Sequence, residues 1–194
     1  EIIYEPYCGL PQSVYCDVNI ASRGNTYHRE DLITGKYNNV YFVQSDLNVS
    51  SKNTGSEQRR TFTHFSGRWI VIDYPKKFSG TVIVKDKDFV GISRDDLEVI
   101  TLENPTFNEM FTVSTNDVQL GYYILTPQLV ERFMELKQSS KGAIIACFKN
   151  GMLHIGIHNR ENAFELDVNN LDIAKDTESF AKDFSLVSKT IDIL

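Results

Sequence analysis

The chain has 194 residues, of which 41% are hydrophobic and 11% aromatic, and its formal net charge is −6. This length and composition allow a hydrophobic core in one domain without disulfides or a metal. The acidic balance argues against sequence-independent nucleic-acid binding, which depends on clustered Lys and Arg. No run approaches the roughly 20 apolar residues of a transmembrane helix, and no signal-peptide pattern opens the chain.

The chain begins at Glu1 instead of Met, so we expect that a further segment precedes it. Its three cysteines, Cys8, Cys16 and Cys147, are odd in number and irregularly spaced. They are not the framework of a small disulfide-rich domain, and a reducing compartment is the simpler interpretation. Cys8 and Cys16 would pair only if a hairpin brought them together.

In the first third of the chain we predict two strands and a helical or turn segment. "SVYCDVNI" (13–20) is a predicted strand, and "YHREDLITGKY" (27–37) a short helical or turn segment. "NVYFVQSDLNV" (39–49) is a half-buried strand with Val40, Phe42 and Leu47 on one face. Residues 50–60 contain no apolar side chain, which predicts a solvated loop between two antiparallel strands.

The similar stretches "FSGRWIVID" (65–73) and "FSGTVIVKD" (78–86) are rich in β-branched residues, and "YPKK" between them marks a turn. We predict adjacent strands of a meander. "LEVITL" (97–102) and "FTVST" (111–115) are further predicted strands, with "ENPTFNE" between them as a turn holding one helical turn.

The clearest helix signal is "LTPQLVERFMELK" (125–137). Thr126 is a natural N-cap and Pro127 fits the first helical position. One apolar stripe follows, made of Leu129, Val130, Phe133, Met134 and Leu136. A second helical region is predicted over 169–194, where apolar residues recur with heptad spacing from Ile173 to Leu194. That stripe packs on its own sheet, or it forms a seam that binds a partner or a second copy in a homodimer.

Asn150-Gly151, in "CFKNGMLHIGIH" (147–158), predicts a hairpin closed by a two-residue turn. In this register Cys147 faces His154, and one face collects Ile144, Ala146, Phe148, Leu153, Ile155 and Ile157. His154 and His158 are then roughly 13 Å apart along a strand and cannot bind one metal ion together. Cys147 and His154 are the candidate nucleophile and base. The alternative is a small buried Cys beside a surface or satisfied His.

The loop starting at Asp86 resembles a calcium loop but has Val90 and Leu97 where oxygen ligands are needed. The sequence also contains no phosphate-binding loop. We therefore predict no metal and no cofactor.

One stretch of the chain carries a candidate basic and aromatic patch for anionic lipid headgroups or an acidic protein partner. Its residues are Arg59, Arg60, His64, Arg68 and Trp69, with Lys76 and Lys77. The alternative is scattered, solvated charges.

Four phrases occur in a distinctive order: "YHREDLITGKYNNVYFVQSDL", "FSGRWIVIDYPKKFSG", "ENPTFNEMFTVSTNDVQLGYYILTPQLVERFMEL" and "IIACFKNGMLHIGIHNRENAFELDV". Together they resemble a bacterial family catalogued as domain of unknown function 3137, from about Tyr27 to the end, most specifically over 111–127. The resemblance implies transmembrane helices before this portion, and no established activity or catalytic residue. Gly121-Tyr122-Tyr123 replaces the family's Ala-Arg-Tyr, so no role of that Arg carries over.

These observations predict an α+β domain over 1–194, or two small lobes with a boundary near 95–110. Its mainly antiparallel sheet would be packed by the helix after Thr126 and by the C-terminal helical segment. We expect a non-catalytic interaction module at the cytoplasmic face of a bacterial membrane. The alternatives are a small-ligand or lipid carrier whose pocket is lined by the apolar residues of 65–73 and the last helix, and an enzyme of unknown reaction.

Overall fold

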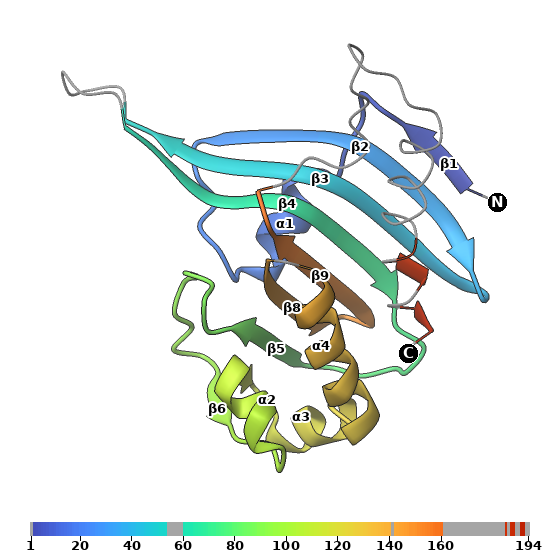
Figure 1. The fold of residues 1–194 in the computed structure, drawn as a ribbon, viewed down its shortest axis with the longest axis vertical. Helices are drawn as coiled ribbons and strands as arrows, with labels where there is room; N and C mark the ends of the chain where they lie inside the picture. The colour runs from blue at the N-terminus through green and yellow to red at the C-terminus, as the bar shows by residue number, and fades with distance from the viewer. Residues whose placement is uncertain are drawn as a thin grey trace.

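A computed structural model describes residues 2–53, 60–140 and 142–160, together with 185, 187, 188, 191 and 192. In this part of the chain, all strands belong to one nine-stranded sheet with the order β1-β2-β3-β4-β9-β8-β5-β7-β6. Every neighbouring pair is antiparallel. The fold is therefore the predicted α+β class with a mainly antiparallel sheet (Figure 1).

The strands differ greatly in length, and the longest ones lie together in one half of the sheet. Their bounds are β1 Ile2–Glu5, β2 Thr26–Tyr37, β3 Val40–Lys52, β4 Thr61–Asp73, β5 Thr81–Asp86, β6 Glu98–Ile100, β7 Phe111–Thr115, β8 Ala143–Lys149 and β9 Met152–His158. β3 and β4 are antiparallel neighbours on either side of the predicted loop, although Ser50, Ser51 and Lys52 belong to β3.

Four helices are described: α1 Gln12–Val18, α2 Pro105–Met110, α3 Val118–Ile124 and α4 Pro127–Ser139. The last three begin at capping side chains, because Asn104, Asp117 and Thr126 each accept a hydrogen bond from a backbone N–H in the first turn. Thr126, Pro127 and the apolar stripe of α4 confirm the predicted helix.

Each face of the sheet carries a buried hydrophobic core. α2, α3 and α4 cover one face over its β5, β7 and β8 region, and α1 lies on the other (Figure 1). We call the two clusters the helix-side core and the α1-side core. The helix-side core includes Phe42, Ile70, Ile72, Val84, Phe107, Ile124, Phe133, Ile144 and Phe148. The α1-side core includes Tyr15, Val18, Leu47, Val49, Phe65, Trp69, Ile83, Ile145 and Cys147.

The predicted hairpin is confirmed residue by residue. β8 pairs with β9 so that Cys147 faces His154 and Phe148 faces Leu153. Asn150 (φ 52°) and Gly151 (φ 73°) both have positive φ, as a type I′ turn requires. The predicted apolar set lies entirely in the helix-side core.

Two local predictions near the N-terminus are wrong. Residues 13–20 contain most of a helix, α1, whose buried residues Tyr15 and Val18 are three positions apart and face the core together. Residues 27–37 lie in a strand, β2, which is held by pairing with β3 along almost its whole length and accommodates a bulge near Asp31 (φ 55°). Most side chains of β2 are only partly buried, so the strand has a polar composition. The alternating apolar pattern that would have predicted a strand is therefore weak.

Two predictions about strand arrangement are also wrong. β4 and β5 are not adjacent, because the β8–β9 hairpin lies between them in the sheet. Leu47 does not share a face with Val40 and Phe42: it lies five residues after Phe42, and odd spacing along a strand places it in the α1-side core.

Most of the predicted C-terminal helical region, and with it the homodimer seam, lies outside the described residues. Val187 and Ile191, two members of its stripe, are described, and both are buried in the helix-side core. Cys8, Cys16 and Cys147 are free thiols: Cys8 is exposed, before α1, and Cys16 lies within α1.

Candidate functional site

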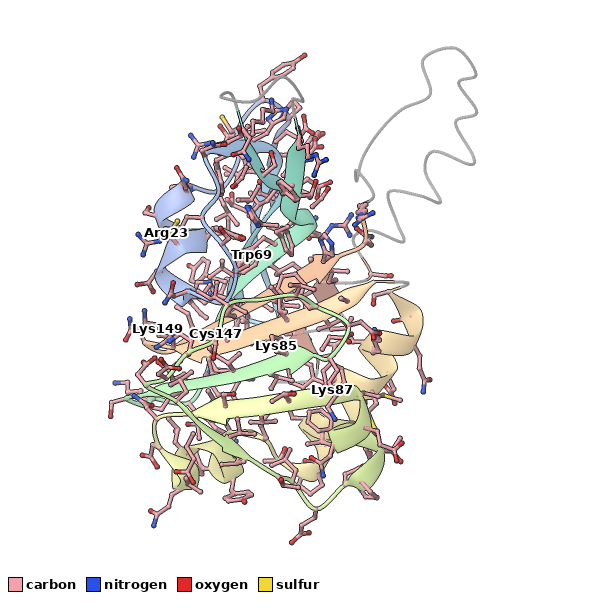
Figure 2. All side chains as sticks on the ribbon, turned by 90° about the vertical axis from the view of Figure 1, so that its left-hand side faces the viewer. Arg23, Trp69, Lys85, Lys87, Cys147 and Lys149 are labelled. Atoms are coloured by element: carbon pink, nitrogen blue, oxygen red, sulfur yellow. The ribbon has the colours of Figure 1, made fainter. Side chains whose placement is uncertain are left out.

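The predicted basic and aromatic patch does not form one exposed surface. Arg59 lies outside the described residues, and Arg60 is exposed. Arg68 is 9% exposed and lies beside Asp46, with 3.7 Å between Nε and Oδ1. Trp69 is 1% exposed and packs edge-on against Tyr15, at 5.0 Å between ring centroids; Figure 2 shows it beside α1.

The remaining members of that patch, His64, Lys76 and Lys77, lie at other places on the sheet and its turns. His64 is bonded to Ser51, with 2.7 Å between Nε2 and Oγ. Lys76 lies over the ring of Tyr123, with Nζ 5.0 Å from the centroid. Lys77 is exposed at the same turn. Arg68, His64 and Lys76 therefore belong to separate local environments.

Cys147 and His154 are brought opposite each other, as predicted, but both are buried. Burial raises the pKa of the Cys147 thiol to about 12 and lowers the pKa of the His154 imidazole to about 4. Both groups are therefore neutral near pH 7. An activated cysteine needs a lowered pKa and partial exposure, so this pair lacks the properties of a nucleophile and its base.

A polar surface lies on the helix-side face of β2, β3 and β4. Three cross-strand rows form it: Glu30, Asp46 and Arg68; His28, Asn48 and Ser66; and Thr26, Ser50 and Thr63. A register shift between Val49 and Ser50 leaves His64 as an extra residue in β4. This bulge keeps Thr61 and Thr63 on the same face as Ser66.

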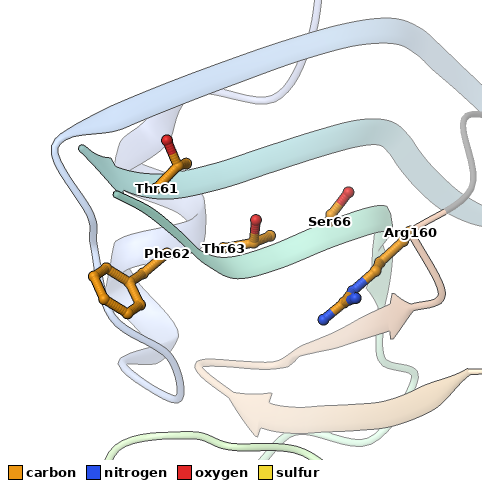
Figure 3. A pocket seen from close by; sticks show the side chains of 5 residues that line it. All are labelled: Thr61, Phe62, Thr63, Ser66 and Arg160. Carbon is orange, nitrogen blue, oxygen red and sulfur yellow. The ribbon is translucent and has the colours of Figure 1, made fainter. Parts of the chain in front are cut away.

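Two adjoining cavities lie along this polar surface. One of about 490 Å³ is lined by Thr61, Phe62, Thr63, Ser66 and Arg160 (Figure 3). The other, of about 310 Å³, is lined by His28, Glu30, Asp46, Leu47, Asn48, Ser66, Gly67 and Arg160. Ser66 and Arg160 line both, so we treat the cavities as one groove, called the polar groove.

Backbone geometry positions Arg160 at this groove. The Arg160 N–H donates to the Ser66 carbonyl (3.0 Å), and the Ser66 N–H donates to His158 Nδ1 (2.9 Å). Because His158 Nδ1 accepts a hydrogen bond, its imidazole is neutral; burial and the nearby Arg160 charge lower its pKa. Arg160 itself has φ 60°, an uncommon conformation for a residue other than glycine.

The seam between β4 and β9 is closed tightly beneath the groove. Gly67 has φ 138°, and a Cβ atom there would lie 2.2 Å from the Ile157 carbonyl oxygen. Only glycine allows the two backbones to approach in this way. The position of Arg160 therefore depends on the bulge, on Gly67 and on the hydrogen bonds of Ser66.

The sequence predicts β4 as a strand, but no sequence pattern marks the residues that line the groove. Ser66 and Gly67 fall inside the stretch we assigned to a strand, and Arg160 follows the hairpin. The bulge and the positive φ of Arg160 depend on pairing between distant strands, so no local pattern signals them. In the described ranges, no three His, Cys, Asp or Glu side chains gather as a metal site requires.

The fold defines an α+β domain built on one antiparallel sheet. The chain belongs to the family described as "Protein of unknown function (DUF3137)", whose model matches residues 63–194. No curated protein matches it. Among solved structures, the mycobacterial trehalose monomycolate transport factor A, TtfA, is similar in fold: the TM-score is 0.56 and the identity 8%, over 100% of this chain and 86% of the other.

None of the helices in the described part of the chain is long and apolar enough to cross a bilayer.

Proposed function

We propose that this chain is a non-catalytic binding module that works at a membrane and uses the polar groove to hold its ligand. The observation that carries the proposal is the groove itself: an open surface of hydroxyl, amide and charged side chains, built by irregular backbone geometry. Recessed sites with a few well-placed polar groups are the usual form of small-ligand sites.

Two observations favour binding over catalysis. Cys147 and His154 are buried and neutral, and neither lines the groove. Ser51 and His64 form the other nucleophile-and-base pair at hydrogen-bond distance, but they do not line it either. Within the described residues no carboxylate contacts His64 to orient its ring. A triad of the serine-hydrolase type needs such an orienting group.

The carrier alternative lacks the strand part of its expected lining, and most of the last helix lies outside the described residues. The apolar residues of 65–73 are packed into the two cores, and from this stretch only Ser66 and Gly67 line the groove. A polar ligand suits these walls better than an acyl chain does.

Support for the membrane part of the proposal comes from two sources. The structural neighbour TtfA is, by its description, a transport factor for trehalose monomycolate. On this chain, Tyr122 and Tyr123 are 51% and 56% exposed, and Lys76 and Lys77 lie at the β4–β5 turn, with Lys76 against Tyr123. Exposed Tyr and Lys are favoured at membrane interfaces. The proposal includes anchoring by a preceding segment, with this domain on the cytoplasmic side, and that part rests on the sequence resemblance.

Vesicle flotation tests the membrane part. We expect the chain to float with phosphatidylglycerol vesicles more than with phosphatidylcholine vesicles, and the double variant Lys76→Glu/Lys77→Glu to lose most of this association. Lys36→Glu/Lys87→Glu has the same change of charge at exposed positions of other elements and is the matched control. Equal loss in both variants, or no association of the unmodified chain, would contradict the proposal.

A further inference from the structure

We propose that the polar groove takes a ligand with one anionic group, of the phosphate or sulfate type, joined to a neutral, hydroxyl-rich body such as a sugar or polyol. Arg160 would bind the anion. This inference deepens the proposed function and rests on it for the role of the groove. It names the chemical class of ligand, which the proposed function leaves open.

Arg160 is the cationic side chain that is available to bind an anion in this groove. Its side chain forms no ion pair or hydrogen bond with the described residues, although its backbone N–H is fixed to Ser66. The residue itself has φ 60°. A non-glycine residue kept in a sparsely populated conformation, with an unengaged charged end lining a cavity, is a reason to suspect a functional role.

The charge of the larger cavity indicates what Arg160 would bind. Among the described residues that line it, Arg160 is the one charged group, and the hydroxyls of Thr61, Thr63 and Ser66 are the other polar side chains. None of the described residues that line it carries a carboxylate to neutralise the guanidinium. Guanidinium groups pair with phosphate through two parallel hydrogen bonds, and hydroxyl groups donate to the remaining oxygens. In Figure 3, the Arg160 side chain extends from the end of β9 below Ser66 and β4.

The smaller cavity has the opposite character. Glu30 and Asp46 line it, with the Asn48 amide and the His28 imidazole. Asp46 lies beside Arg68, whereas the Glu30 carboxylate is 4.0 Å from His28 Nε2. Carboxylate and amide oxygens accept hydrogen bonds from hydroxyl groups, and carboxylates repel a second anion. This end therefore suits an uncharged, hydroxyl-bearing part of the ligand.

The two cavities share Ser66 and Arg160, so one molecule can occupy both. Phe62, 53% exposed, adds an apolar surface at the anion end. Such a ligand has two sources: a phosphorylated or sulfated sugar in solution, or the headgroup of a lipid. The chemistry recognised is the same.

Calorimetric titration of the 194-residue chain tests the inference. The probes are glucose 6-phosphate, glucose and inorganic phosphate. We expect glucose 6-phosphate to bind most tightly, because it alone supplies both parts. Arg160→Gln should weaken its binding by about tenfold or more, with Arg160→Lys in between. Arg132→Gln, at an exposed arginine of α4, is the matched control and should bind as the unmodified chain does.

Equal affinity for glucose and glucose 6-phosphate, no binding of any probe, or undiminished binding by Arg160→Gln would overturn the inference. Phosphatidylglycerol vesicles distinguish the sources. Suppose that glucose 6-phosphate binds and that this binding depends on Arg160. If Arg160→Gln then abolishes flotation with the vesicles, the natural ligand is a lipid headgroup. If Arg160→Gln leaves flotation unchanged, the natural ligand is a soluble molecule. If the chain binds glucose 6-phosphate through Arg160 but does not float with vesicles, this inference stands and the membrane part of the proposed function is wrong.

Discussion

Gly67 is the residue at which the seam between β4 and β9 leaves no room for a side chain. Replacing it with alanine should cost about 3 kcal/mol of unfolding free energy, because the new Cβ atom meets the Ile157 carbonyl and the backbone keeps a positive φ. Chemical denaturation measures the change. The same variant should also weaken ligand binding, since Arg160 depends on this seam.

Gly151 separates the two causes. It also has a positive φ, but nothing lies within 4 Å of its added Cβ atom. Gly151→Ala should therefore cost only about 1 kcal/mol, from backbone strain alone. If both alanine variants had the same free energy of unfolding, the contact between a Cβ atom at position 67 and the Ile157 carbonyl would not affect stability.

His154 should make the fold sensitive to acid. Its pKa is about 4 in the folded chain and 6.5 without burial, so between these values the unfolded state binds the extra proton. Its contribution to stability is therefore complete above pH 6.5 and is lost as the pH falls toward 4, by about 3 kcal/mol. His154→Leu should flatten the stability curve over this range in urea denaturation. An unchanged slope would show that other groups set the acid limit.

The three cysteines should differ in reactivity. Cys147 is fully buried with a raised thiol pKa, whereas Cys8 is exposed. In a timed reaction with iodoacetamide followed by peptide mass spectrometry, Cys8 should be labelled in the native chain and Cys147 only after denaturation. Rapid native labelling of Cys147 would reopen its role as a nucleophile.

At the scale of elements, local signals predicted what local interactions determine. Asn150-Gly151 specified the turn and its register because few dipeptides tolerate positive φ at both positions. Thr126 and Pro127 marked the start of α4 because capping is decided within one turn.

Long-range pairing determined what the sequence did not show. β2 is a strand because β3 lies beside it, and β4 and β5 are separated because the later hairpin enters between them. The polar groove has the same origin: the bulge in β4, the contact at Gly67 and the conformation of Arg160 arise where strands distant in sequence meet. Its residues are ordinary polar types that no spacing distinguishes.

α4 is joined to the sheet by a partly buried ion pair, with 2.5 Å between Lys137 Nζ and Asp86 Oδ2. Asp86 is 1% exposed and also accepts hydrogen bonds from the Ile144 and Asp88 N–H groups. Lys137→Met leaves this carboxylate buried without its cation, and we expect a loss of about 2–4 kcal/mol in urea denaturation.

The i,i+3 pair between Arg132 and Glu135 on the same helix is exposed, so Arg132→Met should cost less than about 0.5 kcal/mol. The double variant Asp86→Asn/Lys137→Met should be more stable than the sum of its single variants predicts, because the buried charge is removed with its partner. Strict additivity would mean that the pair does not couple α4 to β5.

On the scale of the whole molecule, one sheet serves two purposes. Around β5, β7, β8 and β9 it is buried under α2, α3 and α4 on one side (Figure 1). Beyond them, β2, β3 and β4 carry polar residues on the same face, and the groove lies there. A packed core thus holds a polar surface in fixed geometry, which is an arrangement suited to binding.

Nuclear magnetic resonance can show whether this groove is the binding surface. Amide signals of the ¹⁵N-labelled chain would be followed while glucose 6-phosphate is added. We expect saturable shifts at Ser66, Gly67 and Arg160, with little change around Cys147 and His154. Saturable shifts centred on the buried Cys147 and His154 pair, with the groove signals unmoved, would contradict this expectation.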